Sequence, residues 1–263
     1  MDVIERVTDS ATRVLAPNPS PMTLDGTNTW VLQGGAGGSV VVDPGPPDEA
    51  HLERILDLGP VALILLTHHH IDHSESVERL RELTGASVAA ADPALCFDAP
   101  PLVDSERRGH AGVEWITLLT PGHSRDSACL LLVDDRALLT GDTVLGRGTT
   151  VVAHPDGRLA DYLESLRRLR DVAAEHVDTL LPGHGPVGRN PLEMLDFYLA
   201  HRQERLTQVS RARDALGAHA APMDVVRVVY ADVDRSLWPA AELSVRAQLE
   251  YLDDAGGTPS AHR

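Results

Sequence analysis

The chain contains no lysine, since all 23 of its basic residues are arginine. This absence excludes a lysine nucleophile, Schiff-base chemistry and a P-loop lysine. Long apolar runs are also missing. The longest, at 61–66 and 128–133, have the length of strands and are far too short to span a bilayer. The first residues carry acids rather than an apolar run, so we expect a soluble, cytoplasmic protein without a signal peptide.

Cysteine and basic charge are both scarce. The two cysteines, Cys96 and Cys129, form no CxxC pair and lie in apolar surroundings, where a small buried thiol is expected. The 39 acidic residues outnumber the 23 basic ones and give a net charge of −16. Such a charge opposes loose attraction to phosphate backbones. We therefore expect no membrane partner and no strong non-specific binding of nucleic acid.

Hydrophobic patterning divides the chain into two parts. In residues 1–188, short β-rich runs alternate with helical ones, which predicts central sheets with helices outside. In residues 189–263 the pattern is helical, with a long helix over 192–216 and two further helical runs. We predict a catalytic domain of residues 1–188 and a C-terminal helical domain of residues 189–263, whose last residues, 256–263, are expected to fray.

The segment THHHIDH at 67–73 directly follows a buried strand. If the chain stays extended there, alternate side chains share one face of the strand. The side chains on that face would be His68, His70 and Asp72. His69 would point away and have a structural role, and His73 would begin the turn into a helix over 74–83.

Three further residues of metal-binding type each follow a hydrophobic strand beside a glycine: His123, Asp142 and His184. A strand that ends in a glycine turn is a rigid arm that presents the next side chain. Imidazole nitrogens and carboxylate oxygens suit Zn²⁺ and related ions, and the lack of cysteine at these positions argues against a closed structural site. Zn²⁺ is the ion we expect, with Mn²⁺ or Fe as alternatives. Histidines outside these motifs, such as His51, are expected to be surface or internally satisfied groups.

The seven residues divide into two sets of ligands for a dinuclear metal site. One ion would be held by His68, His70 and His123, the other by Asp72, His73 and His184, and Asp142 could bridge them. Two cations about 3.5–4 Å apart can lower the pKa of a shared water toward roughly 7. Hydrolysis by this activated hydroxide needs no protein nucleophile, and the two carboxylates, Asp72 and Asp142, are the predicted catalytic residues.

In this order, the HxHxDH motif followed by His123, Asp142 and His184 resembles the metallo-β-lactamase superfamily, over about residues 28–186. The resemblance implies an αββα sandwich with the metals at one edge, between the two sheets. It also implies supporting roles beside the ligands for Asp43, in VVVDPG, and for Ser124.

Within the superfamily, the chain is most similar to the β-lactamase-like protein 2 subfamily. Loop, turn and helix motifs of that group are echoed by LGRGTT at 145–150, LPGHGP at 181–186 and HRQERL at 201–206. The antibiotic-degrading class has cysteine in place of Asp142. The resemblance implies a small winged-helix-like C-terminal domain, truncated here, and activities that include single-strand-selective endoribonuclease and acyl-carrier thioesterase.

Five residues are candidates for substrate contact: Arg147, Thr149, Thr150, Arg202 and Arg205. The first three lie on a loop after Asp142 and could equally form an ordinary surface loop. The two later arginines are candidates for anion contact, because the resemblance brings their helix toward the mouth of the site.

Two substrate classes remain open. The phosphodiester of single-stranded RNA is favoured by the whole-chain resemblance. An acyl-thioester or small ester, with weak promiscuous β-lactamase activity, is favoured by the acidic composition and the truncated C-terminal domain. A third hypothesis is a metal-stabilised binding protein without catalysis. The substrate is the only partner predicted, and the oligomeric state is left open.

Overall fold

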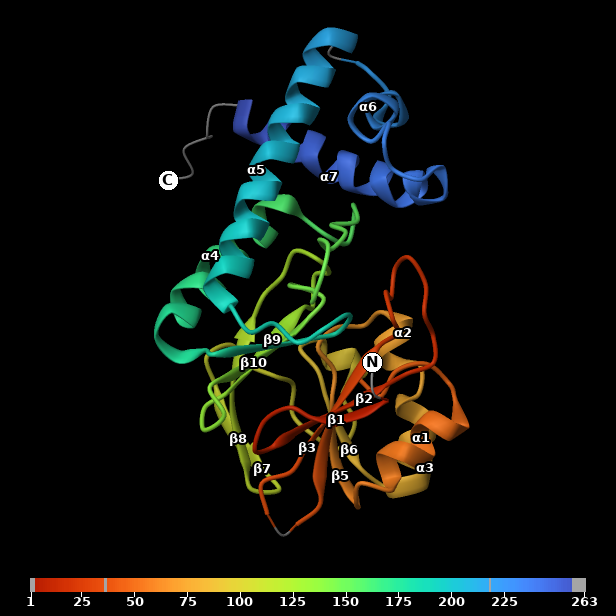
Figure 1. The fold of residues 1–263 in the computed structure, drawn as a ribbon, viewed down its shortest axis with the longest axis vertical. Helices are drawn as coiled ribbons and strands as arrows, with labels where there is room; N and C mark the ends of the chain where they lie inside the picture. The colour runs from red at the N-terminus through yellow and green to blue at the C-terminus, as the bar shows by residue number, and fades with distance from the viewer. Residues whose placement is uncertain (1–2, 36, 218, 257–263) are drawn as a thin grey trace.

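Two β-sheets form the centre of the computed structural model, which describes residues 3–35, 37–217 and 219–256 (Figure 1). The strands of the first sheet, in spatial order, are β1 (Ile4–Arg6), β2 (Ala11–Leu15), β3 (Asn28–Leu32), β4 (Ser39–Val42), β5 (Val61–Leu65) and β6 (Ser87–Ala89). The second sheet runs in the order β11 (Thr179–Pro182), β10 (Ala137–Gly141), β9 (Ala128–Leu132), β8 (Val113–Leu119) and β7 (Arg107–His110).

The direction of each strand follows from the connection before it. Strands β1 to β4 are antiparallel neighbours, joined by short loops except for the longer segment 16–27 between β2 and β3, whereas β4, β5 and β6 are parallel. The parallel steps cross over through helices α1 (Glu49–Leu56), α2 (Ile71–Ser74) and α3 (Val77–Thr84). In the second sheet, α4 (Leu159–His176) connects the parallel strands β10 and β11. A parallel pair needs such a crossover, because a hairpin cannot return the chain to the same end of the sheet.

The side chains of the strands fill three apolar layers. Val40 and Val42 point into the layer between the two sheets, together with Trp30 and Trp115. Val41 points the other way, into the layer that α1 and α3 cover. The outer face of the second sheet packs against α4 in a third layer. Since both faces of the central strands are buried, strands such as β4, β5 and β9 read as continuous apolar runs, whereas the edge strands β1 and β7 are largely exposed. The predicted αββα sandwich is confirmed.

The region after the sandwich is helical, as predicted. Its elements are α5 (Pro191–Leu216), α6 (Pro222–Val229), a short 3₁₀ helix η2 (Arg235–Leu237) and α7 (Trp238–Gly256). Leu195, Tyr198 and Leu206 of α5 share the apolar layer of α4, while Val209 and Val245 belong to a separate core between the C-terminal helices. The predicted domain boundary at 188/189 stays a prediction. Of the tail expected to fray, residues 257–263 lie outside the described residues.

The predicted extended conformation through Asp72 is wrong, whereas the helix predicted over 74–83 is present with a later start, as α3. The chain enters α2 already at Ile71, and the backbone N–H groups of His73 and Ser74 both donate to the carbonyl of His70 at 3.0 Å. A carboxylate in the first turn is favourable there, because the N-terminal end of a helix carries partial positive charge. A second helix, α3, then begins at Val77. Asp72 and His73 are therefore placed by a helical turn and not by strand alternation.

No helix in the described ranges combines the length and the apolar character needed to cross a membrane.

His51 of α1 is fully buried where α1 packs on the first sheet. The pKa of its imidazole therefore reports on this packing. Its Nε2 lies 2.9 Å from Thr29 Oγ1, and burial lowers its pKa to about 4, from the ordinary value of 6.5. A histidine with a folded-state pKa below its unfolded value contributes stability above pH 6.5 that is lost as the pH falls toward 4.

We therefore expect wild type to lose about 2 kcal/mol more of its free energy of unfolding than His51→Gln between pH 7 and pH 5. Urea unfolding of both proteins at the two pH values measures this difference. Parallel losses in the two proteins would contradict a buried neutral imidazole.

Candidate metal centre

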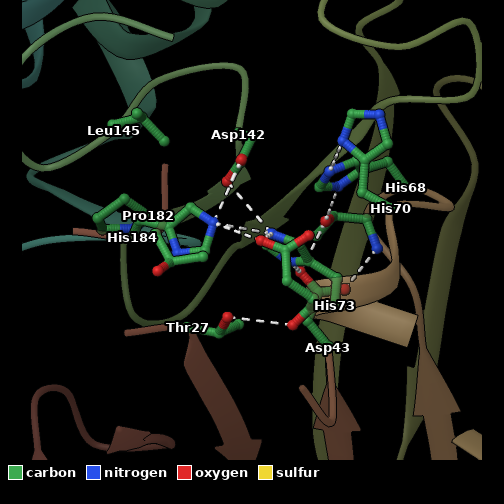
Figure 2. Close-up of polar contacts among 12 residues, drawn as sticks. Thr27, Asp43, His68, His70, His73, Asp142, Leu145, Pro182 and His184 are labelled. Atoms are coloured by element: carbon green, nitrogen blue, oxygen red, sulfur yellow. Dashed lines mark hydrogen bonds and ion pairs between the residues drawn. The ribbon is translucent and has the colours of Figure 1, made fainter. Parts of the chain in front are cut away.

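Chain segments at one end of the sandwich bring the seven predicted ligands together, and Figure 2 labels five of them, His68, His70, His73, Asp142 and His184. The segment between β5 and α2 carries His68 and His70, and α2 itself carries Asp72 and His73. The turns after β8, β10 and β11 carry His123, Asp142 and His184. The ends of β5, β10 and β11 converge because these strands are parallel to a neighbour within their own sheets, and the sheets are stacked face to face.

The first set of ligands is a triad of imidazoles, His68, His70 and His123. His70 Nδ1 lies 3.1 Å from His68 Nε2 and 3.0 Å from His123 Nε2. With Zn–N bonds of about 2.0–2.1 Å, ligand atoms at the corners of a tetrahedron are about 3.3 Å apart, so this spacing suits a metal ion. Burial lowers the pKa of all three, to about 4 for His70, which keeps them in the neutral form that ligates metals.

The second set consists of Asp72, His73 and His184. His184 Nε2 lies 3.1 Å from Asp72 Oδ2 and 3.2 Å from His73 Nε2. Asp72 Oδ2 lies 3.7 Å from His73 Nε2. The three atoms therefore face one point, as the first triad does.

Asp142 lies between the two triads, as Figure 2 shows. Its Oδ1 is 3.5 Å from His73 Nε2, while its Oδ2 is 3.4 Å from His184 Nε2 and 3.8 Å from His123 Nε2. The carboxylate is buried, and Oδ1 accepts no hydrogen bond from any described residue. This is the position of a bridging ligand.

The buried carboxylates of the site favour binding of a cation. Burial raises the pKa of the Asp142 carboxyl, but the neighbouring His184 and His73 outweigh burial and hold the pKa well below its usual value. Burial likewise opposes protonation of His73, yet the charges of Asp142 and Asp43 raise its pKa well above 6.5, and the same kind of balance raises the pKa of His184 to about 9. A buried carboxylate must be neutralised, and a divalent ion can replace the protons that these acids attract.

Asp43 supports the ligands from behind, at the end of β4. Its Oδ1 accepts from the backbone N–H of Thr67 at 2.8 Å, and its Oδ2 accepts from Thr67 Oγ1 at 2.7 Å. Oδ2 also lies 2.9 Å from Nδ1 of His73. A carboxylate on Nδ1 fixes the ring orientation and leaves Nε2 facing the metal position. Sequence analysis missed Thr67, although it directly precedes the first ligand.

Two further ligand histidines have partners on the ring nitrogen that faces away from the site. His184 Nδ1 lies 3.2 Å from the carbonyl of Gly26, and His123 Nδ1 lies 2.7 Å from the carbonyl of Val151. A carbonyl only accepts, so each Nδ1 donates, which leaves Nε2 as the nitrogen that can ligate a metal in the neutral ring.

Ser124 contacts Asp126 and not a ligand. Its Oγ lies 2.9 Å from Asp126 Oδ1, which in turn lies 2.7 Å from His69 Nδ1. Asp126 was missed in the sequence analysis, where its place two residues after Ser124 was the available signal. Asp156, also missed, could complete a further group of possible ligands with His69 and His70. His69 is thus held by acids beside the predicted centre.

Four of the five predicted substrate contacts line one pocket, Thr149, Thr150, Arg202 and Arg205. Thr150 Oγ1 also lies 3.1 Å from His123 Nδ1. Arg147 lies apart from them on the surface, where it forms an ion pair with Asp25. Arg202, predicted to contact an anion, is 7% exposed and donates to the carbonyl of Thr150.

Comparison with known proteins assigns the two parts of the chain to two families. The family model described as "Metallo-beta-lactamase superfamily" matches residues 22–184, and "Beta-lactamase associated winged helix domain" matches residues 221–257. The chain is 33% identical to a "Beta-lactamase-like protein 2 homolog" of Drosophila melanogaster, over 96% of this chain and 91% of the relative. It is 34% identical to an "Atrochrysone carboxyl ACP thioesterase" of Aspergillus fumigatus, over 75% of this chain and 62% of the relative.

Among solved structures, a beta-lactamase domain protein from Burkholderia ambifaria matches with a TM-score of 0.80 and 23% identity, over 96% of this chain and 88% of that one. The match to the winged-helix family bears out the expected kind of C-terminal region. The described part of that region consists of helices and has no strand after Pro182.

Gly183 leaves room for two of the ligands. A Cβ at this position would lie 2.6 Å from Asp142 Oδ1 and 2.7 Å from His73 Cε1. We expect Gly183→Ala to displace both side chains and to lower the metal-to-protein ratio measured by elemental analysis. The circular dichroism spectrum should stay that of the wild type, because the overall fold is retained. Gly109→Ala is the matched control, because its Cβ would come no closer than 3.4 Å to another atom. Equal metal content in both variants would contradict the placement of Asp142 and His73 as metal ligands beside Gly183.

Asp43 has a left-handed backbone, with φ at +53°, a conformation that asparagine also tolerates. Asp43→Asn keeps the shape and removes the charge behind His73, so we expect metal affinity to fall about 10- to 100-fold. Competition with a chromophoric chelator measures this affinity. Asp98→Asn, at an exposed position with φ at +52°, is the control for the backbone conformation. Unchanged metal affinity in Asp43→Asn would show that the charge of Asp43 does not support the metal ligands.

Proposed function

The chain belongs to the metallo-beta-lactamase superfamily, and from this premise we propose that it is a metal-dependent hydrolase whose site holds two divalent ions. The observation that carries the proposal is the pair of ligand triads with the buried, unsatisfied Asp142 carboxylate between them. Zn²⁺ is our first choice for the ions, with Mn²⁺ or Fe as alternatives, because the ligand atoms are imidazole nitrogens and carboxylate oxygens.

Bound at such a site, two divalent ions supply Lewis acidity and make water acidic enough to give up a proton near neutral pH. The protein's own part is to hold the ligand side chains in place and to supply the negative charge that attracts the cations. Asp142 and Asp72 supply the negative charge of the site, and both are proposed as catalytic residues in this sense. Asp43 and the carbonyls of Gly26 and Val151 fix which ring nitrogen of each histidine faces the metals.

We favour an acyl-thioester as the substrate. The relative from Aspergillus fumigatus is named as a thioesterase acting on an acyl carrier protein. The net charge of −16 disfavours a polyanion, since basic residues dominate binding to phosphate backbones.

Single-stranded RNA is the second candidate. It is supported by the likeness to the β-lactamase-like protein 2 group, which extends over nearly the whole chain. The order of the two candidates is therefore the reverse of the one expected from the sequence alone.

A substrate panel tests the proposal with protein stripped of metal by a chelator and then reloaded with zinc, manganese or iron. We expect thioester hydrolysis with kcat/KM above about 10⁴ M⁻¹s⁻¹ only after reloading. Asp142→Asn is expected to lose at least about 100-fold, because it removes the charge that both ligand sets share. Asp178→Asn, at an exposed acid that precedes β11, at the end of the strand away from His184, keeps full activity as the control.

A labelled single-stranded RNA in the same panel separates the two candidates. Metal-dependent cleavage of RNA without turnover of thioesters would replace the first candidate by the second. Hydrolysis of neither substrate class by fully metal-loaded protein would contradict the proposed function.

A further inference from the structure

A pocket of about 280 Å³ lies where three parts of the chain meet beside the metal centre. The N-terminal loop contributes Pro21 and Met22, and the loop after β10 contributes residues 149–151. The rest of the wall comes from α5, from the segment after α6 and from η2 and α7. In Figure 1 these C-terminal helices stand beyond the end of the sandwich that carries α2. The pocket is thus built jointly by the sandwich and the C-terminal helices.

The pocket shares a wall with the metal centre. Thr150 and Val151 line the pocket, and both contact Nδ1 of His123, through a side-chain oxygen at 3.1 Å and a carbonyl at 2.7 Å. The opposite nitrogen of the same ring, Nε2, faces the other metal ligands. One imidazole ring and its supporting loop therefore lie between the pocket and the position of the metals.

The charge of the pocket is opposite to that of the chain. Arg202 and Arg205 line it, and none of the described lining residues is an acid, although the chain has 39 acidic residues. Such a local excess of positive charge attracts an anion and not a neutral group.

The buried arginine has an uncommitted donor. Arg202 is only 7% exposed, its Nη2 donates to the carbonyl of Thr150, and its Nε has no partner among the described residues. Nδ1 of His201 is also buried without a described partner. A buried charged donor without an acceptor is costly, so a polar ligand at this position is favourable. Arg205 binds Gln208 and Val229 through a single nitrogen, Nη1.

The remaining wall of the pocket is largely apolar. It is formed by Met22, Val233, Leu237, Ala240 and Ala241. A ligand that fits both walls carries an anionic group on an otherwise uncharged arm. Guanidinium groups recognise phosphate and carboxylate oxygens through paired N–H donors. Acyl carriers have this chemistry, because their thiol ends an arm that a phosphate ester joins to the carrier.

We propose that this pocket binds the anionic group on the thiol-bearing arm of the thioester substrate, with a phosphate ester as its ligand. The inference rests on the proposed thioesterase function. Arg205 and Arg202 would contact the phosphate, while the scissile thioester reaches the metal centre past His123. Specificity for the leaving thiol would then reside in the C-terminal helices.

Arg202 could instead serve only to hold Thr150 against His123. A purely structural clamp would affect all substrates alike. The test must therefore compare substrates that share one acyl group and differ in the charge of the thiol arm. Butyryl thioesters of pantetheine 4′-phosphate, of uncharged pantetheine and of glutathione, which carries carboxylates, meet this condition.

We expect wild type to prefer the phosphate-bearing thioester over the pantetheine thioester by about 10- to 100-fold in kcat/KM. Arg205→Gln reduces this preference to below about 3-fold, and Arg205→Lys, which keeps the charge but loses the planar fork, gives an intermediate value. Arg211→Gln, an exposed arginine on the same helix and outside the pocket, keeps the wild-type preference. If the glutathione thioester is preferred as strongly as the phosphate, the assignment to phosphate is overturned in favour of carboxylate.

Binding without turnover separates this inference from the proposed function. Calorimetric titration with pantetheine 4′-phosphate and with pantetheine, on metal-free and metal-loaded protein, is expected to show the same 10- to 100-fold preference, and Arg205→Gln is expected to lose it. If this preference is found but no thioester is hydrolysed, the pocket is supported and the thioesterase function fails. Thioester hydrolysis with no preference for the phosphate in either assay, or a preference that Arg205→Gln retains, would overturn the pocket proposal alone.

Discussion

The structure depends on placing two carboxylates, Asp43 and Asp142, among histidines with almost no access to solvent. Both acids are at least nine-tenths buried, and only Asp43 has its oxygens satisfied by neighbouring donors. A buried carboxylate without enough donors is unfavourable by several kcal/mol unless a cation lies beside it. The ligand cluster is therefore stable as a cation site and poor as a bare hydrogen-bond network. The conformations of the surrounding loops follow from this constraint.

The sandwich meets the constraint by using strand ends as rigid supports. Asp43 ends β4, and Asp142 and His184 follow the neighbouring parallel strands β10 and β11. These segments are closely packed, and the side chains between them can move little. A Cβ at Gly183, for example, would collide with Asp142 and His73. The central strands of the two sheets are buried on both faces, so a shift of one strand relative to another would expose apolar side chains. The geometry of the site is thus fixed by the same packing that stabilises the fold.

The sequence alone predicts much of this arrangement, because periodicity and ligand chemistry are local signals. The αββα layers, the helical C-terminal region and the convergence of the seven ligand residues could all be expected from the strand and motif pattern. The turn at Ile71 could not, since a four-residue helix has no periodicity, and strand alternation gave the wrong conformation for Asp72. Nor could the contact of Asp126 with His69, or the burial of Arg202. These depend on side chains far apart in the sequence, whose distances only the packed structure determines.

The burial of Arg202 connects the two parts of the chain. Its guanidinium lies over the ring of Tyr162 at 5.0 Å and donates to Thr150, whose hydroxyl contacts His123. A helix of the C-terminal region thereby reaches the loop that supports a predicted metal ligand. Because Leu195 and Tyr198 of the same helix are buried against the second sheet, α5 cannot move freely relative to the sandwich. The C-terminal region is consequently part of the architecture of the site, and changes in its packing would alter both the pocket and the position of His123.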